Sequence, residues 1–126
     1  TGAAVATTRV LTELEGRLDG LAIRVPVPNG SIADLVAQTE RPVTVESVND
    51  AFREAAESEA MKGILAISDE ELVSSDIVGS TYSAIVDGPS TMAVGEHTVK
   101  VLAWYDNEWG YAARCADLAD YIAGKQ

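Results

Sequence analysis

The sequence predicts an α+β domain in which a mixed, mostly antiparallel sheet has helices packed on one face. Three stretches place apolar residues at helical spacing, and about six alternate or are rich in β-branched residues, as strands do. Turn residues at Asp87-Gly88-Pro89 and Gly95-Glu96 join the last strands into consecutive hairpins. Helices combined with hairpin-connected strands are typical of α+β domains. The 126 residues suffice for one domain, and a 47% hydrophobic content with only 6% aromatic residues predicts a core of small aliphatic side chains.

The first two elements are a helix over residues 3–14 and a strand over residues 21–28. Apolar residues of the first stretch share one helical face, and Gly16 suits a left-handed C-cap. In the second stretch Leu21, Ile23, Val25 and Val27 point to one side. Because proline cannot donate a ladder hydrogen bond, this strand should end near Pro26 or lie at a sheet edge there.

A hairpin and an amphipathic helix are predicted next. Asn29-Gly30 is a type I′ turn signal that leads into an alternating strand over residues 31–38. Thr44 then suits the N-cap of a helix over residues 45–58. Its buried stripe should consist of Val45, Val48, Phe52 and Ala55.

The second half of the chain is rich in predicted strands. Residues 72–80 have an irregular pattern, which we interpret as a short strand and a loop. The other four stretches have strand patterns, and they cover residues 64–67, 82–86, 91–94 and 98–105.

A final helix follows the last strand. Asp106 or Asn107 can cap it, and Glu108 favours the positive end of the helix dipole. A single apolar stripe, predicted to be buried, contains Tyr111, Cys115, Leu118 and Ile122. A loop between a strand and a helix start is a favourable place for a functional site.

Composition restricts the partners. The chain has 20 acidic and 9 basic residues, a net charge of −11, which argues against nucleic acid as a partner. The acidic residues are spread along the chain, which is typical of a solvated surface. Alternatively, they indicate a protein from a high-salt cytoplasm, where salt screens the repulsion between them. No membrane span or secretory signal is recognisable, so no membrane partner is expected. A single cysteine fits a reducing, cytoplasmic location.

Local chemistry gives no complete active site. Cys115 falls on an apolar stripe, so it is interpreted as a core residue rather than a nucleophile. His97 falls in a turn and is interpreted as an exposed residue. One cysteine and one histidine do not make a metal site. Thr1-Gly2 can be a simple N-cap or an anion site at a helix start, and the cap is favoured locally. Arg24 can pair with a carboxylate or hold a phosphate.

Several longer motifs are similar to glyceraldehyde-3-phosphate dehydrogenases, in the order of that family. The most specific are WYDNEWGY, from Trp104, and RVPVPN, from Arg24. TGAA, MKGIL and LVSSDIVGSTYSAIVD also match. The resemblance implies that residues 1–126 are the C-terminal portion of the catalytic domain, without the dinucleotide-binding domain. The nucleophilic cysteine and its histidine would lie outside this chain, because neither Cys115 nor His97 matches them, so no catalytic residue is expected in it.

The same resemblance implies roles for six residues. Thr1, Gly2 and Arg24 match residues that bind the phosphates of the substrate and of inorganic phosphate. Asn107 matches the asparagine that bonds the nicotinamide carboxamide of NAD or NADP, Tyr111 matches an aromatic residue near that ring, and Glu108 belongs to the same turn.

The implied parent is a phosphorylating, homotetrameric enzyme that oxidises an aldehyde through a thioester in glycolysis or gluconeogenesis. The isolated chain is expected to be inactive. A non-catalytic module that binds phosphate or self-associates, and an erythrose-4-phosphate dehydrogenase fragment, remain alternatives. The choice between NAD and NADP is not expected to be made in this part of the family's sequence.

Overall fold

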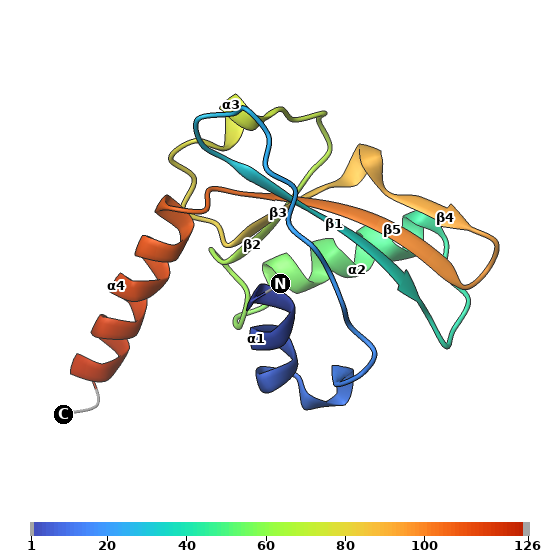
Figure 1. Ribbon diagram of the computed structural model, residues 1–126, viewed down its shortest axis with the longest axis horizontal. Helices are drawn as coiled ribbons and strands as arrows, with labels where there is room; N and C mark the ends of the chain where they lie inside the picture. Colours follow the sequence, from blue (N-terminus) through green and yellow to red (C-terminus); the bar gives the residue numbers. More distant parts are fainter. Residues whose placement is uncertain (1, 125–126) are drawn as a thin grey trace.

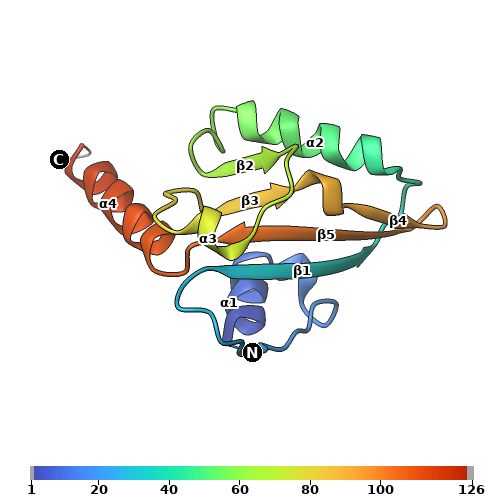
Figure 2. The same ribbon diagram turned by 90° about the horizontal axis from the view of Figure 1, so that it is seen from above.

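The structure is a computed structural model that describes residues 2–124. Its centre is a five-stranded mixed sheet, as Figures 1 and 2 show. The strands are β1 (Ser31–Gln38), β2 (Leu65–Ser68), β3 (Ala84–Asp87), β4 (Met92–Val94) and β5 (Thr98–Tyr105). The sheet order is β1-β5-β3-β2, and β4 pairs with β5. The β2–β3 pair is parallel and the other described pairs are antiparallel, which confirms the predicted α+β class.

The described helices differ in their relation to this sheet. The α-helices are α1 (Gly2–Val10), α2 (Val45–Glu57), α3 (Ser74–Ile77) and α4 (Trp109–Ala123), and the short 3₁₀-helices are η1 (Thr12–Leu14) and η2 (Gly88–Ser90). Helix α2 runs beside β2 and along one face of the sheet (Figures 1 and 2). Helix α4 extends away from the sheet at the end of β5 (Figure 1). Helix α2 is therefore the helix that builds a core with the strands.

The core lies between α2 and the sheet. Val86, Val99 and Val101 are at most 6% exposed, and Val48 and Phe52 of α2 pack against them. Valines 99 and 101 point to this face because side chains alternate along β5. This confirms the small-aliphatic core and most of the predicted stripe of α2, although Val45 at its start is 37% exposed.

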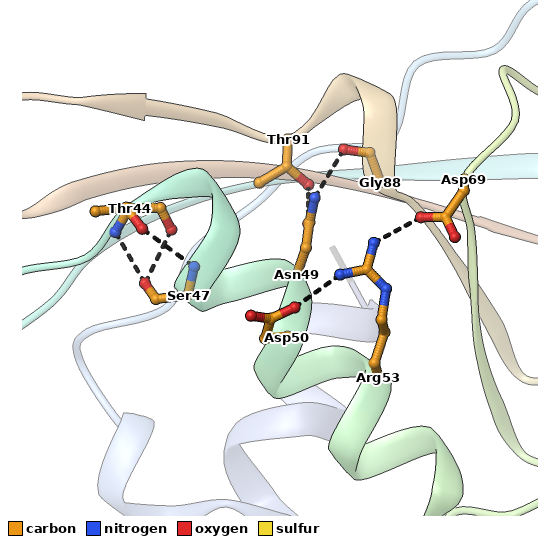
Figure 3. A network of polar contacts seen from close by, with 8 residues as sticks. All are labelled: Thr44, Ser47, Asn49, Asp50, Arg53, Asp69, Gly88 and Thr91. Atoms are coloured by element: carbon orange, nitrogen blue, oxygen red, sulfur yellow. Dashed lines mark hydrogen bonds and ion pairs between the residues drawn. The ribbon is translucent and has the colours of Figure 1, made fainter.

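Helix α2 is fixed at its start by the predicted cap. The Thr44 hydroxyl accepts a hydrogen bond from the Ser47 amide, and the Ser47 hydroxyl accepts one from the Thr44 amide. Figure 3 shows this reciprocal pair. Such a capping box satisfies two amides that the first turn of a helix leaves without partners.

A buried polar contact also holds α2, and the apolar pattern gave no indication of it. Asn49 is 8% exposed; its Nδ2 donates to the Gly88 carbonyl at 3.1 Å, and its Oδ1 accepts from the Thr91 hydroxyl at 2.8 Å (Figure 3). On the exposed side of the helix, Arg53 bridges Asp50 and Asp69. Asn49 is buried at low cost because both ends of its amide are satisfied.

Three predictions for the N-terminal third are wrong. Residues 21–28 form no strand, so Asn29-Gly30 is not a hairpin turn, although Gly30 does adopt φ +93°. Leu21 and Ile23 are 77% and 78% exposed, which follows from the lack of a partner strand among the described residues. The first helix ends at Val10 rather than Leu14, and a separate 3₁₀ turn precedes Gly16 at φ +73°.

The later elements depart less from expectation. Strands β1 and β5 have the predicted bounds, and β2, β3 and β4 differ from them by one or two residues. Residues 72–80 contain the short helix α3 instead of a short strand. The stripe of α4 is exposed rather than buried: Tyr111 is 73%, Leu118 57% and Ile122 54% exposed, and Cys115 is exposed as well. Its predicted burial is wrong because α4 leaves the sheet.

Candidate functional site

The turn between β5 and α4 is organised by the carboxylate of Asp106. Its Oδ1 accepts hydrogen bonds from the amides of Glu108 at 2.9 Å and Trp109 at 2.8 Å. Asp106 therefore satisfies amides at the helix start, although the N-cap position itself is Glu108, whose side chain makes no cap hydrogen bond. Its Oδ2 accepts from Asn29 Nδ2 at 2.8 Å and from the Gly79 amide at 2.9 Å. Asp106 is 2% exposed, and these bonds, that from Trp109 first, lower its pKa from 3.8 to about 2. The carboxylate therefore joins three separate segments while it stays ionised.

Asn107 follows this anchored residue and is exposed. Its Oδ1 accepts a hydrogen bond from the Ser31 hydroxyl at 3.1 Å. Its Nδ2 makes no hydrogen bond to any residue between 2 and 124. An exposed amide with an unused donor can bind the oxygen of a ligand.

Arg24 lies in the irregular segment that leads to Asn29, not in a strand. Its side chain is exposed and forms no ion pair or hydrogen bond with a described residue. Arg53, Arg114 and Lys100, by contrast, each hold an aspartate. The carboxylate alternative for Arg24 therefore has no support here, and the guanidinium remains available to an anion.

The other predicted site residues are placed as follows. Thr1 lies outside the described residues, and Gly2 begins α1 and is exposed. Glu108 and Tyr111 are exposed on the turn and the first turns of α4. Contact with the Cys115 thiol, one helical turn later, raises the pKa of Tyr111. The structure brings Asn107, Glu108 and Tyr111 together at one helix start, but no described contact joins them to Arg24 or Gly2.

Comparison with known proteins decides the family. Residues 1–107 match the family model described as glyceraldehyde 3-phosphate dehydrogenase, C-terminal domain. The chain belongs to this family. Over 99% of its length it is 58% identical to the glyceraldehyde-3-phosphate dehydrogenase of Geobacillus stearothermophilus and 52% identical to one from Bacillus subtilis. Over 98% of its length it is 53% identical to a chloroplastic glyceraldehyde-3-phosphate dehydrogenase of Arabidopsis thaliana. It spans 37%, 36% and 31% of these relatives, respectively.

The two residues with reactive side chains lie too far apart to form a nucleophile and its base. His97 is exposed, as predicted, and precedes β5, whereas Cys115 lies on α4 beyond its other end. The eight residues of β5 alone span about 27 Å at the usual rise per strand residue.

Other kinds of site are not evident in residues 2–124. Acidic, cysteine and histidine side chains form no group of three or more that could hold a metal ion. Within that same stretch, no helix combines the length and apolar character needed to cross a bilayer. A groove of about 490 Å³ beside α2 is lined mainly by apolar side chains such as Val48, Phe52 and Met61. Its lining includes one polar side chain, Ser47, and no charged one.

Sequence reasoning missed the residues that support Asn107. The sequence pattern predicts Asn29 as a turn residue, Ser31 as a strand residue and Asp106 as a cap alone. Their partners lie 77, 76 and 27 residues away, so no local pattern could show them. The available signal was the polar run Asn29-Gly30-Ser31 before one strand, opposite Asp106-Asn107 after its antiparallel neighbour.

Proposed function

We propose that this chain is the C-terminal portion of the catalytic domain of a phosphorylating glyceraldehyde-3-phosphate dehydrogenase of glycolysis or gluconeogenesis. The parent enzyme would oxidise glyceraldehyde 3-phosphate to an enzyme-bound thioester, with hydride passing to NAD(P)⁺. Attack of inorganic phosphate on the thioester would then release the acyl group as an acyl phosphate and free the thiol. The reactive cysteine and its histidine would come from another part of the polypeptide. What this chain contributes is binding and orientation, which lower a barrier by holding the reacting groups in place.

The phosphate-binding role is carried by Arg24. A guanidinium that is exposed and holds no described carboxylate, in a chain with 20 acidic residues, can receive the phosphate of a substrate. Thr1 and Gly2 would bind the second phosphate. Gly2 begins α1, and helix starts present free amides to anions. The anions proposed are the substrate's phosphate and inorganic phosphate.

The second role is to orient the cofactor, which is NAD or NADP. This cofactor supplies a nicotinamide ring that accepts hydride. The exposed Nδ2 of Asn107 fits the carboxamide oxygen of that ring, since it is a donor without a partner in the described chain. Tyr111 and Glu108, on the same helix start, would flank the ring and support the turn. The rest of the cofactor would be held by the dinucleotide-binding domain, since the C-terminal domain does not bind it alone.

Substrate comparison tests the Arg24 role in the complete polypeptide. Arg24→Ala should lower kcat/KM for glyceraldehyde 3-phosphate about 10- to 100-fold, the usual worth of a charge-assisted hydrogen bond. The value for unphosphorylated glyceraldehyde should change little. Arg41→Ala is the matched control, because Arg41 is also exposed. Equal losses for both aldehydes would refute phosphate binding by Arg24.

Self-association is the second candidate function, and one observation favours it. Apolar side chains of residues 21–28 and of α4 are exposed, including Leu21, Ile23 and Leu118. Exposed apolar surface of this extent promotes association. This fits a homo-oligomeric parent enzyme, and light scattering of the isolated chain tests the self-association.

A further inference from the structure

The hydroxyl of Ser31 faces the oxygen end of the Asn107 side-chain amide. It donates to Oδ1 at 3.1 Å, so that oxygen is engaged and Nδ2 is left exposed. We propose that Ser31 is a positioning residue that presents Asn107 Nδ2 as a hydrogen-bond donor to the nicotinamide carboxamide. This inference rests on the cofactor role proposed for Asn107.

Orientation matters because the two ends of an asparagine amide have opposite chemistry. Nδ2 is a donor and Oδ1 an acceptor, and a half-turn of the side chain exchanges them. A carboxamide oxygen can be bound only by the donor end. An exposed asparagine without a fixed partner would divide its time between both orientations, and the fraction that is competent to bind would fall.

The backbone around this pair is held from both sides. Ser31 begins β1 and is paired with Tyr105, the last residue of β5. Two residues before Ser31, Asn29 donates to Asp106, which directly follows Tyr105. Gly30 between Asn29 and Ser31 adopts φ +93°, and a Cβ there would come within 3.1 Å of the Ser74 carbonyl. The position therefore favours glycine, and the backbone held in this way places the Ser31 hydroxyl within hydrogen-bond distance of Asn107 Oδ1.

The inferred function of Ser31 differs from that of Asp106. Asp106 fixes where the turn lies, because its four partners come from the Asn29 loop, Gly79 and the start of α4. Among residues 2–124, the hydrogen bond that the Ser31 hydroxyl makes is the one to the side chain of Asn107. Its removal should thus alter the recognition of one ligand group and leave the fold intact.

Paired ligands in the complete polypeptide test this inference. NAD(P)⁺ is compared with the matching ADP-ribose, which lacks the nicotinamide. Ser31→Ala should weaken binding of NAD(P)⁺ about three- to tenfold, the worth of one ordinary hydrogen bond, and leave ADP-ribose binding unchanged. Ser31→Thr retains the hydroxyl and should restore wild-type binding.

Asn107→Ala separates this inference from the function on which it rests. If Asn107→Ala leaves the ratio of the two affinities unchanged, the cofactor role of Asn107 is refuted. If Asn107→Ala changes the ratio and Ser31→Ala does not, the positioning role alone is refuted. The inference also fails if Ser31→Ala weakens both ligands equally, if threonine does not rescue, or if Ser31→Ala lowers the ratio further in an Asn107→Ala background.

Discussion

At the scale of single residues, Asp106 is the most consequential side chain. Four hydrogen-bond donors surround its carboxylate, and they stabilise the ionised form, which lowers the pKa from 3.8 to about 2. An aspartate is well suited here because each of its oxygens can accept two hydrogen bonds. Asparagine would have a donor group in place of one oxygen and could not accept from all four.

Asp106 should make stability fall in strongly acid solution. Because its folded-state pKa is lower than the unfolded value, its contribution is complete above about pH 4 and is lost as the pH falls towards 2. Urea unfolding of the protein and of Asp106→Asn between pH 5 and 2 checks this. The variant should be less stable at pH 5, and the difference should shrink as the pH falls.

Asp120→Asn is the control, because Asp120 is exposed on α4. A constant difference between the protein and Asp106→Asn across this pH range would show that the carboxylate's charge is not the source of the stability.

Elements that pack within the chain were the ones that their sequence pattern predicted well. The first residues of β5 alternate between half-buried and buried, and β1, although mostly exposed, pairs with β5 along its whole length. Helix α2 has a cap and an apolar stripe that meets the core. Residues 21–28 also alternate between apolar and other residues, but they have no described partner strand. They therefore have the sequence pattern of a strand without forming one. Alternating apolar residues suit a pleated strand with one buried face, but such a strand forms only where a neighbouring strand pairs with it.

Site residues within contiguous motifs could be predicted from the sequence, whereas the contacts between distant segments could not. Arg24, Asn107, Glu108 and Tyr111 could be proposed from contiguous motifs. The bonds from Ser31 and Asn29 required knowledge of the register in which β1 meets β5. The exposed stripe of α4 was unpredictable for another reason: an amphipathic pattern identifies an apolar face, but not what covers it.

The cap of α2 offers a prediction at the scale of one element. Thr44→Ala removes the hydroxyl that accepts from the Ser47 amide, and should reduce the free energy of unfolding by about 1 kcal/mol. Thr44→Ser keeps that oxygen and should cost much less. Urea unfolding measures both variants. Equal losses for alanine and serine would indicate that the methyl group, rather than the cap, stabilises the helix.

The whole molecule carries a net charge of −11, and its stability should depend on salt. Mutual repulsion of the acids favours expanded states, and salt screens it over about 10 Å at 0.1 M. Thermal unfolding in a series of KCl concentrations should give a Tm that rises with salt, with a similar rise in NaCl. A maximal Tm at the lowest salt would refute both this prediction and the halophilic interpretation.

Exposed apolar surface predicts that the 126-residue chain associates with itself. Leu21 and Ile23 are more than three-quarters exposed, and burying them in a contact between chains would remove them from water. Light scattering should therefore give a mass above that of one chain, rising with concentration. Replacing both residues by lysine should reduce the association more than Val78→Lys, a single exposed apolar residue elsewhere. A monomer at every concentration would contradict the prediction.

The buried amide of Asn49 has a consequence for how the molecule opens. It ties α2 to Gly88 and Thr91, which lie 39 and 42 residues further along the chain. Neither segment can detach without leaving the other with unsatisfied buried groups. In native-state hydrogen exchange, the amides of α2 and those around η2 should then share one opening free energy, so that two distant stretches of sequence behave as a single cooperative unit.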